Sequence, residues 1–246
     1  MANKEHTIFG IYPIEEAVSS DIVVDKLFVQ KDIVNPKIDS IIKQLEKLDT
    51  TINYVPIEKL NRLTKGNHQG IVAYTSPISF YSLEEVIESS LSKKESSLFL
   101  ILDQISDVRN FGAIIRTAEC TGVDAIIIQK KGGAPITGDT VKTSAGAIFK
   151  IPICKVDHIK DAIYYLQASN IETVAATEKA TESIYDLDLN KPIAIIMGSE
   201  GKGVSNSVLN IADHKASLPL KGQINSLNVS VASGAFLYEV VRQRGL

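Results

Sequence analysis

Polar and glycine residues gather in three short segments of the C-terminal half, and the first segment carries two arginines and an asparagine. This segment, DQISDVRNFGAIIRTAECTG (103–122), holds Arg109, Asn110 and Arg116 around the start of a predicted helix at 112–121. Taken alone, Asn110 suits an N-cap and Arg116 a solvated helix position. A cation near a helix N-terminus is disfavoured by the macrodipole unless an anion lies nearby. The pattern therefore also suits contact with a phosphate.

The second segment, MGSEGKGVS (197–205), contains three glycines, which allow close backbone approach and free amide donors. It is not a P-loop, because only two residues separate Gly198 from Gly201, and it lacks the third glycine of a dinucleotide fingerprint. A tight turn and a cofactor loop both remain open. Glu200 is unexplained, since a carboxylate at the tip of a buried strand is costly unless it is exposed or paired.

The third segment, INSLNVSVASGAFLYEVVRQR (224–244), alternates Ser226, Asn228 and Ser230 with apolar residues before it becomes helical. An N-cap at Asn228 or Ser226 explains one of these polar residues. Two apolar rows follow, one through residues 229, 232, 236 and 240 and another through 231, 235 and 238. A helix with two apolar rows is expected to pack on a sheet and on a second surface, such as another subunit.

The elements that must position these segments form an alternating pattern from residue 98 onward. Buried strands are predicted at 98–103, 125–130, 173–177 and 192–198, and helices at 112–121, 138–148, 158–169 and 204–212. Alternation of this kind predicts an α/β domain with a parallel sheet covered on both sides. Ligands of such sheets bind at the carboxyl ends of the strands, where the first two segments begin.

The N-terminal part differs in pattern. Residues 1–76 are predicted to form a small α/β unit, with strands at 26–30 and 70–75 and a helix at 36–48. Residues 77–97 are serine-rich and polar, and we interpret them as a linker with one short helix at 82–91. The expected domains are therefore 1–76 and 98–246.

Composition excludes several classes of protein. The 246 residues carry a formal charge of -3 and a pI near 5.9, and this balance does not indicate a nucleic-acid binder. Cys120 and Cys154 have no metal-ligand or disulfide spacing, and no metal site is expected. H-E-x-x-H and G-x-S-x-G motifs are absent from the sequence. Without a signal peptide or a membrane-length apolar run, a cytoplasmic protein is expected.

Together and in this order, NFGAIIR (110–116), IIMGSEGKGVS (195–205) and LPLKGQINSLNVSVASGAFLYEVVRQR (218–244) resemble the three motifs of the SpoU (TrmH-like) RNA 2′-O-ribose methyltransferases of the SPOUT superfamily. The resemblance covers 98–246. In addition, IFGIYPIEEAV (8–18) and NHQGIVA (67–73) resemble the small substrate-binding domain of longer members, which is similar to the ribosomal protein L30e/L7Ae type. The chain is most similar to members that methylate a guanosine ribose in 23S rRNA.

The resemblance implies a trefoil knot in the C-terminal domain and a homodimer whose active site lies at the subunit interface. It implies S-adenosylmethionine as methyl donor, RNA as substrate, and no metal. A tRNA ribose methyltransferase of the same family is the main alternative. A non-catalytic RNA-binding module in ribosome assembly is a weaker one, because the motif residues are intact.

By motif match, the resemblance assigns catalysis to Arg116, with Asn110 beside it. Glu200 is expected to hold the arginine or orient the site, while Ser226 and Asn228 help to fix the ribose or the cofactor. A guanidinium does not readily lose a proton, so we interpret Arg116 as a clamp on a phosphate or on the developing alkoxide rather than as a base.

The resemblance also implies that the cofactor is bound mainly through backbone groups, at Ala176, Thr177, Gly198, Gly201, Leu218, Leu220 and Leu227. A short strand at 216–220 is expected to present Leu218 and Leu220 to the adenine. Because the overall charge is negative, RNA binding is expected to rest on a local patch of Arg109, Arg116, Lys130, Lys131 and Lys142, with Lys65 in the small domain.

Overall fold

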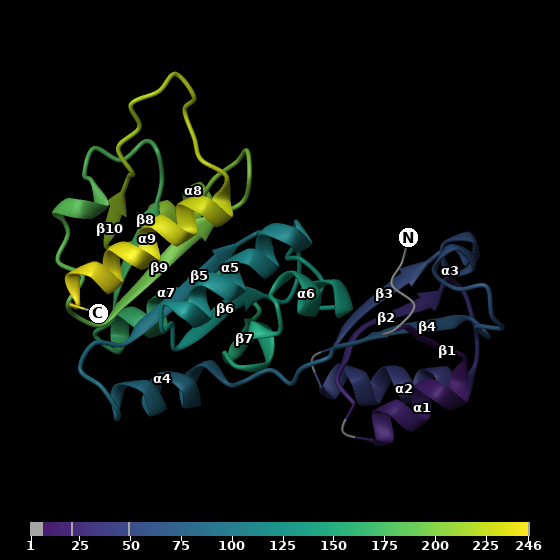
Figure 1. Cartoon of the computed structure of the whole chain (residues 1–246). Helices are drawn as coiled ribbons and strands as arrows, with labels where there is room; N and C mark the ends of the chain where they lie inside the picture. The colour runs from purple at the N-terminus through teal and green to yellow at the C-terminus, as the bar shows by residue number, and fades with distance from the viewer. Residues whose placement is uncertain (1–6, 21, 49, 246) are drawn as a thin grey trace. The chain divides into compact units, whose positions relative to one another are not determined.

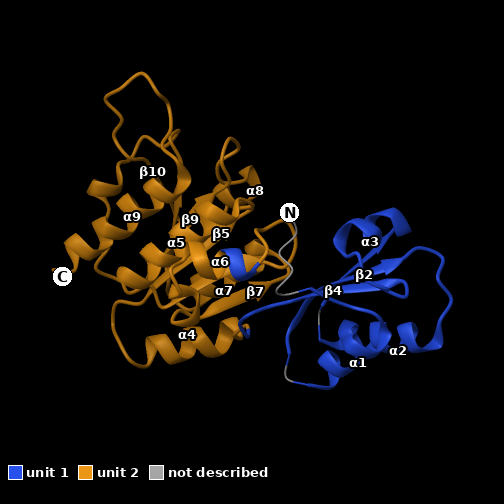
Figure 2. Ribbon diagram, turned by 45° about the vertical axis from the view of Figure 1, so that its right-hand side comes forward, with its two compact units in different colours: residues 1–79, 136–139 blue, residues 80–135, 140–246 orange. Residues whose placement is uncertain are grey.

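The computed structural model describes residues 7–20, 22–48 and 50–245. The chain divides into two compact units (Figure 2). Unit 1 comprises residues 1–79 with 136–139, and unit 2 comprises residues 80–135 with 140–246. Among the described residues no helix combines the length and the apolar character needed to cross a membrane.

Unit 1 is a four-stranded sheet in the order β1-β4-β2-β3. Strand β2 pairs parallel with β3 and antiparallel with β4, and β4 pairs antiparallel with β1. The strands are β1 (Thr7–Phe9), β2 (Val24–Gln30), β3 (Thr51–Val55) and β4 (Ile71–Thr75), and the helices are α1 (Ile11–Ser19), α2 (Pro36–Lys47) and α3 (Ile57–Leu63). The two strands and the helix expected here are all present.

Helix α2 shows why the sequence folds this way. Asn35 caps it, because its side-chain oxygen accepts a hydrogen bond from the Lys37 amide at 3.0 Å. Its apolar stripe is buried in the core of unit 1 through Ile38, Ile41, Ile42 and Leu45. Leu48, which follows the helix, is 66% exposed and does not extend the stripe.

Unit 2 is a six-stranded sheet in the order β10-β8-β9-β5-β6-β7, with every neighbouring pair parallel. This confirms the parallel α/β sheet. The strands are β5 (Leu98–Asp103), β6 (Ala125–Gln129), β7 (Ile153–Val156), β8 (Glu172–Ala176), β9 (Ile193–Gly198) and β10 (His214–Ala216). Strands β5 and β9 are buried along their whole length, as continuous apolar runs predict.

Helices cover both faces of the unit 2 sheet (Figure 1). Helices α4 (Leu83–Leu91), α7 (Ile159–Ala168) and α8 (Asn206–Leu209) share a core with Phe99 and Ile101 of β5. Helix α5 (Val108–Cys120) packs against α9 (Val229–Gln243), which lies on β9. Helix α6 (Gly138–Thr143) and 3-10 turns at Ala147–Phe149 and Ile184–Asp186 complete the connections.

The structure does not agree with the interpretation of residues 77–97 as a linker. Most of it belongs to unit 2: Leu83 and Ile87 of α4 are buried in its core, and the Tyr81 amide donates to the Ile153 carbonyl at 3.0 Å. The short helix predicted at 82–91 is present as α4, and Leu83 and Ile87, at helical spacing, bury one of its faces in unit 2.

Helix α5 begins earlier than the sequence suggested. Asp107, not Asn110, is its N-cap, and the Asp107 carboxylate accepts hydrogen bonds from the amides of Arg109 (2.9 Å) and Asn110 (2.8 Å). Arg116 therefore lies in the third turn. Since the macrodipole acts mainly on the first turn, the argument for an anion beside Arg116 loses its basis.

Three further boundaries differ. Strand β10 ends at Ala216, so Leu218 and Leu220 are not on a strand as expected. The helix predicted at 138–148 stops at Thr143, because Ala145 and Gly146 adopt positive φ values of 51° and 82°. The helix predicted at 204–212 is limited to α8. Strand β7 was not predicted.

Candidate cofactor pocket and active site

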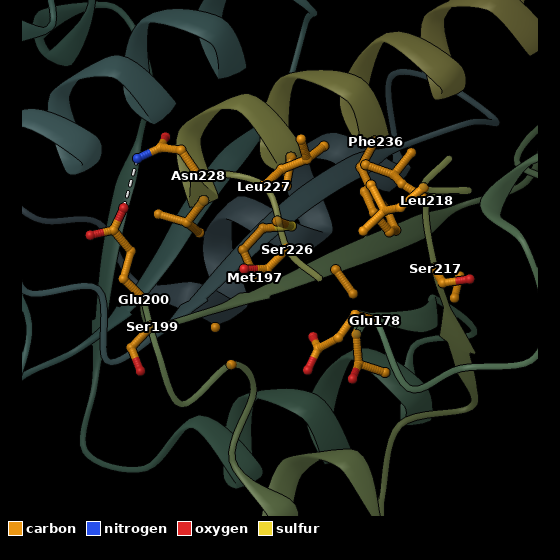
Figure 3. A pocket seen from close by; sticks show the side chains of 18 of the residues that line it. Glu178, Met197, Ser199, Glu200, Ser217, Leu218, Ser226, Leu227, Asn228 and Phe236 are labelled. Atoms are coloured by element: carbon orange, nitrogen blue, oxygen red, sulfur yellow. Dashed lines mark hydrogen bonds between the residues drawn. The ribbon is translucent and has the colours of Figure 1, made fainter. Parts of the chain in front are cut away.

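A pocket of about 360 Å³ lies where β8, β9 and β10 end (Figure 3). The turns that follow these strands form its floor and sides, and the start of α9 forms its remaining wall. All seven residues proposed for cofactor binding line it: Ala176, Thr177, Gly198, Gly201, Leu218, Leu220 and Leu227. Of the five proposed catalytic residues, Glu200, Ser226 and Asn228 line it too.

The glycine-rich segment is both a tight turn and a wall of this pocket. Ser199 and Gly203 exchange two backbone hydrogen bonds, of 3.1 and 2.9 Å. A Cβ on Gly198 would lie 2.0 Å from the backbone of Gly203 and Val204, so no other residue fits there. The buried Asp103 carboxylate accepts a hydrogen bond from the Ser205 amide at 2.8 Å and fixes the end of the turn.

One side of the pocket is apolar. Met197, Val229 and Phe236 are almost fully buried, and in Figure 3 Phe236 lies beside Leu218. Leu220 and Leu227, which are 40% and 45% exposed, stand nearer the solvent. Apolar walls of this kind suit a flat heterocycle.

The opposite side is polar and held by side-chain hydrogen bonds. Asn228 Nδ2 donates to Glu200 Oε1 at 2.7 Å, drawn as a dashed line in Figure 3, and to Asn110 Oδ1 at 3.1 Å. The carboxamide oxygen of Asn228 accepts from the Ser230 amide and hydroxyl. We call these four residues, Asn110, Glu200, Asn228 and Ser230, the Asn228 network. They bring the first and second sequence segments together with the third.

Asn228 is also the N-cap of α9, as one of the two alternatives predicted. The first apolar row of α9 is directed inward, with Phe236 and Val240 buried. In the second row, Val231 and Tyr238 are 57% and 54% exposed. None of the residues that the structure describes covers these two side chains within one chain.

The structure does not bring Arg116 to the pocket. It is exposed on α5, and the described part of the chain offers it no hydrogen-bond or ion-pair partner. Arg109, Lys131 and Lys142 are exposed as well. Lys130 differs, because its ammonium pairs with Asp157 at 3.1 Å and its side chain is 18% exposed.

Several lining residues were not singled out from the sequence, notably Glu178, Met197, Ser217 and Phe236. The signal that could have found Glu178 and Ser217 is position, since both closely follow the carboxyl end of a strand. Phe236 belonged to a predicted apolar row but was assigned only to packing. No group of three or more His, Cys, Asp or Glu side chains in the described residues could hold a metal ion.

Comparison with known proteins agrees with this architecture. The model of the SpoU rRNA Methylase family matches residues 97–238, and that of the RNA 2′-O ribose methyltransferase substrate-binding domain matches residues 7–81. The Bacillus subtilis putative TrmH family tRNA/rRNA methyltransferase YacO is 34% identical over 99% of this chain and 98% of its own length.

Two solved structures are also similar. The SpoU methyltransferase AviRb from Streptomyces viridochromogenes, in complex with AdoMet, has a TM-score of 0.62 at 24% identity and covers 97% of this chain and 90% of its own. The A. aeolicus TrmH/SpoU tRNA modifying enzyme has a TM-score of 0.57 at 32% identity, over 66% of this chain and 82% of its own. Family model and relatives together establish that this chain belongs to the SpoU rRNA Methylase family and is an RNA methyltransferase.

Proposed function

We propose that this protein transfers a methyl group from S-adenosylmethionine to a ribose 2′-hydroxyl of RNA, with a guanosine of 23S rRNA as the favoured target. The observation that carries the proposal is the meeting of the three motif segments. The second and third line one pocket, and Asn110 of the first is hydrogen-bonded to Asn228 at its rim. The match of residues 7–81 to a 2′-O ribose substrate-binding domain supports the choice of hydroxyl.

The pocket fits the proposed cofactor. Its volume of about 360 Å³ lies within the range of small-molecule sites. Phe236 and Leu218 offer apolar contact to an adenine, while Glu178 places negative charge in the lining of a pocket for a cationic ligand. When bound, S-adenosylmethionine supplies a methyl group activated by its sulfonium. The chain has to align the ribose oxygen with that group and exclude competing acceptors.

In this proposal, Arg116 of one subunit acts at the pocket of a second copy of the chain. Its exposed guanidinium is outside the pocket of its own subunit, and the exposed Val231 and Tyr238 on α9 offer an apolar surface for dimer contact. The trefoil knot belongs to the same proposal. It rests on the resemblance of the three motifs and on the family match.

Mixed dimers test this shared site. Arg116→Ala and Glu200→Gln should each be inactive alone. If Arg116 acts on the partner's pocket, a refolded equal mixture regains about one quarter of wild-type activity, because half of the dimers then carry one intact site. If both residues act in the same subunit, the mixture stays inactive. Sedimentation equilibrium of the wild type checks the dimer itself.

The substrate is tested by mapping ribose methylation in RNA from cells with and without the gene. Loss of one mark in 23S rRNA supports the favoured target. Loss of a tRNA mark favours the second candidate, which the 32% identity to a tRNA modifying enzyme keeps open. Unchanged maps, combined with no transfer of tritiated methyl groups in vitro, would indicate a non-catalytic RNA-binding module.

The proposed RNA surface includes the exposed Arg109, Lys131 and Lys142, with Lys65 in unit 1. Because Lys130 is already paired with Asp157, we give it a smaller share. Each phosphate contact releases counterions, so binding through these cations falls with salt. An affinity that did not change between 50 and 200 mM salt, roughly the range over which phosphate contacts are lost, would argue against this surface.

A further inference from the structure

We infer that Ser230 is a positioning residue, which fixes through Asn228 the atoms that Asn110 and Glu200 present to the ribose hydroxyl. This inference rests on the proposed function and deepens it. Ser230 is half-buried on the first turn of α9, does not line the pocket and belongs to neither apolar row. Helix packing alone therefore does not explain it.

The hydrogen bonds of Asn228 are the first step. Its Oδ1 accepts from the Ser230 hydroxyl at 2.6 Å and from the Ser230 amide at 3.0 Å, with the Val231 amide further away at 3.4 Å. A carboxamide oxygen has two lone pairs, so this atom has no capacity left. The hydroxyl contact is the shortest of the three and lies at the short end for O–H···O bonds.

The other end of the carboxamide is then fixed. With Oδ1 directed at the helix, Nδ2 must point away from it, and its two hydrogens reach Glu200 Oε1 at 2.7 Å and Asn110 Oδ1 at 3.1 Å. A reversed amide would place its oxygen against the Glu200 carboxylate, and two acceptors repel. The hydrogen-bonding capacity of the Asn228 carboxamide is used inside the protein, so this side chain orients other groups and does not itself hold the substrate.

The direction of the hydrogen bonds from Asn228 decides which donor and acceptor groups Asn110 and Glu200 leave available. Asn110 directs its oxygen at Asn228 and therefore presents the two N–H donors of its amide to the other side. Glu200 has Oε1 occupied and presents Oε2, an acceptor. A neighbouring donor and acceptor match a hydroxyl group, which accepts one hydrogen bond and donates another. Glu200 and Asn228 are exposed at the pocket rim, where a large substrate has access.

A first pair of variants isolates the Ser230 hydroxyl. Ser230→Ala keeps both backbone donors to Asn228, so the cap and the melting temperature should change little. Loss of one hydrogen bond should lower kcat for methyl transfer by about 3- to 10-fold, with the Kd for S-adenosylmethionine unchanged. Ser230→Thr, which keeps the hydroxyl, should restore kcat. Full kcat in Ser230→Ala, or parallel losses of stability and cofactor affinity, would overturn the inference.

A second set tests polarity directly. Asn228→Asp retains an N-cap acceptor but removes both donors, and kcat should fall by about 100-fold or more. Adding Glu200→Gln rebuilds the bond between the two positions with donor and acceptor exchanged. We expect the double variant to regain the wild-type melting temperature but not methyl transfer. Recovery of both would show that the bond, and not its polarity, is what matters.

The assay separates this inference from the proposed function. Wild-type protein is incubated with tritiated S-adenosylmethionine and RNA from cells that lack the gene, and the product is digested to nucleosides. No 2′-O-methylated nucleoside with wild type would overturn the proposed function. A wild-type product combined with fully active Ser230→Ala would overturn the positioning role alone.

Discussion

The two sides of the pocket are built in different ways. The apolar side rests on buried strand ends, on Phe236 of α9 and on a turn that allows only glycine at position 198. The polar side rests on side-chain hydrogen bonds between exposed and half-buried residues, with Asn228 at the centre. Backbone-built surfaces depend on the fold as a whole, whereas a side-chain network depends on the chemistry of each member. Substitutions on the two sides should therefore fail differently.

Gly198→Ala should have the largest effect, because it forces the 199–205 turn away from β9. We expect the free energy of unfolding to fall by about 3 kcal/mol and cofactor binding to be lost with it. Calorimetry of unfolding and of cofactor binding measures both. Gly222→Ala is the matched control, since nothing lies within 4 Å of a Cβ there. Normal cofactor affinity in Gly198→Ala would mean that the turn tolerates displacement.

Glu200→Gln should impair the function of the polar side and leave that of the apolar side intact. The variant keeps the size of the side chain but removes the carboxylate from the polar side. We expect turnover to fall roughly 100-fold, while the Kd for S-adenosylmethionine changes by less than about 3-fold. Single-turnover kinetics and equilibrium binding give the two numbers. If binding and turnover fell together, Glu200 would belong to cofactor binding and the distinction between the sides would be lost.

Arg244 offers a side-chain network with no part in the pocket. Its half-buried guanidinium donates to the carbonyls of Ser96, Leu189 and Lys191, which ties the end of α9 to β5 and β9. Arg244→Ala leaves these acceptors unsatisfied and should lower the free energy of unfolding by about 2 kcal/mol. Denaturant unfolding measures this. Turnover at 25 °C should match wild type, and a loss of turnover would couple this end of α9 to the site.

The success of the sequence-based predictions also differs between the backbone-built parts and the side-chain network. Continuous apolar runs predicted β5 and β9, because burial on both faces leaves a strong signal. The residues that the motifs suggested for the cofactor line the pocket, but Glu178, Met197, Ser217 and Phe236 were not singled out. The Asn228 network was not predicted, since its polarity depends on three chain segments meeting in space. The N-cap at Asp107 was missed because Asn110 is an equally good capping residue, and only the backbone decides between them.

Asp213 provides the smallest expected effect, in a side-chain network that does not line the pocket. Burial would raise the pKa of its carboxyl group, but hydrogen bonds from the hydroxyl and amide of Thr173, at 2.7 and 2.9 Å, outweigh it and hold the pKa below its usual value. A depressed pKa stabilises the fold above the unfolded value of about 4, and this stabilisation is lost as the pH falls through the folded value. Asp213→Asn should therefore melt slightly below wild type at pH 7, and the two melting curves should converge as the pH falls below about 4. A difference that stayed constant from pH 7 to pH 3 would show that the amide substitution, and not the charge of Asp213, sets the stability of this connection.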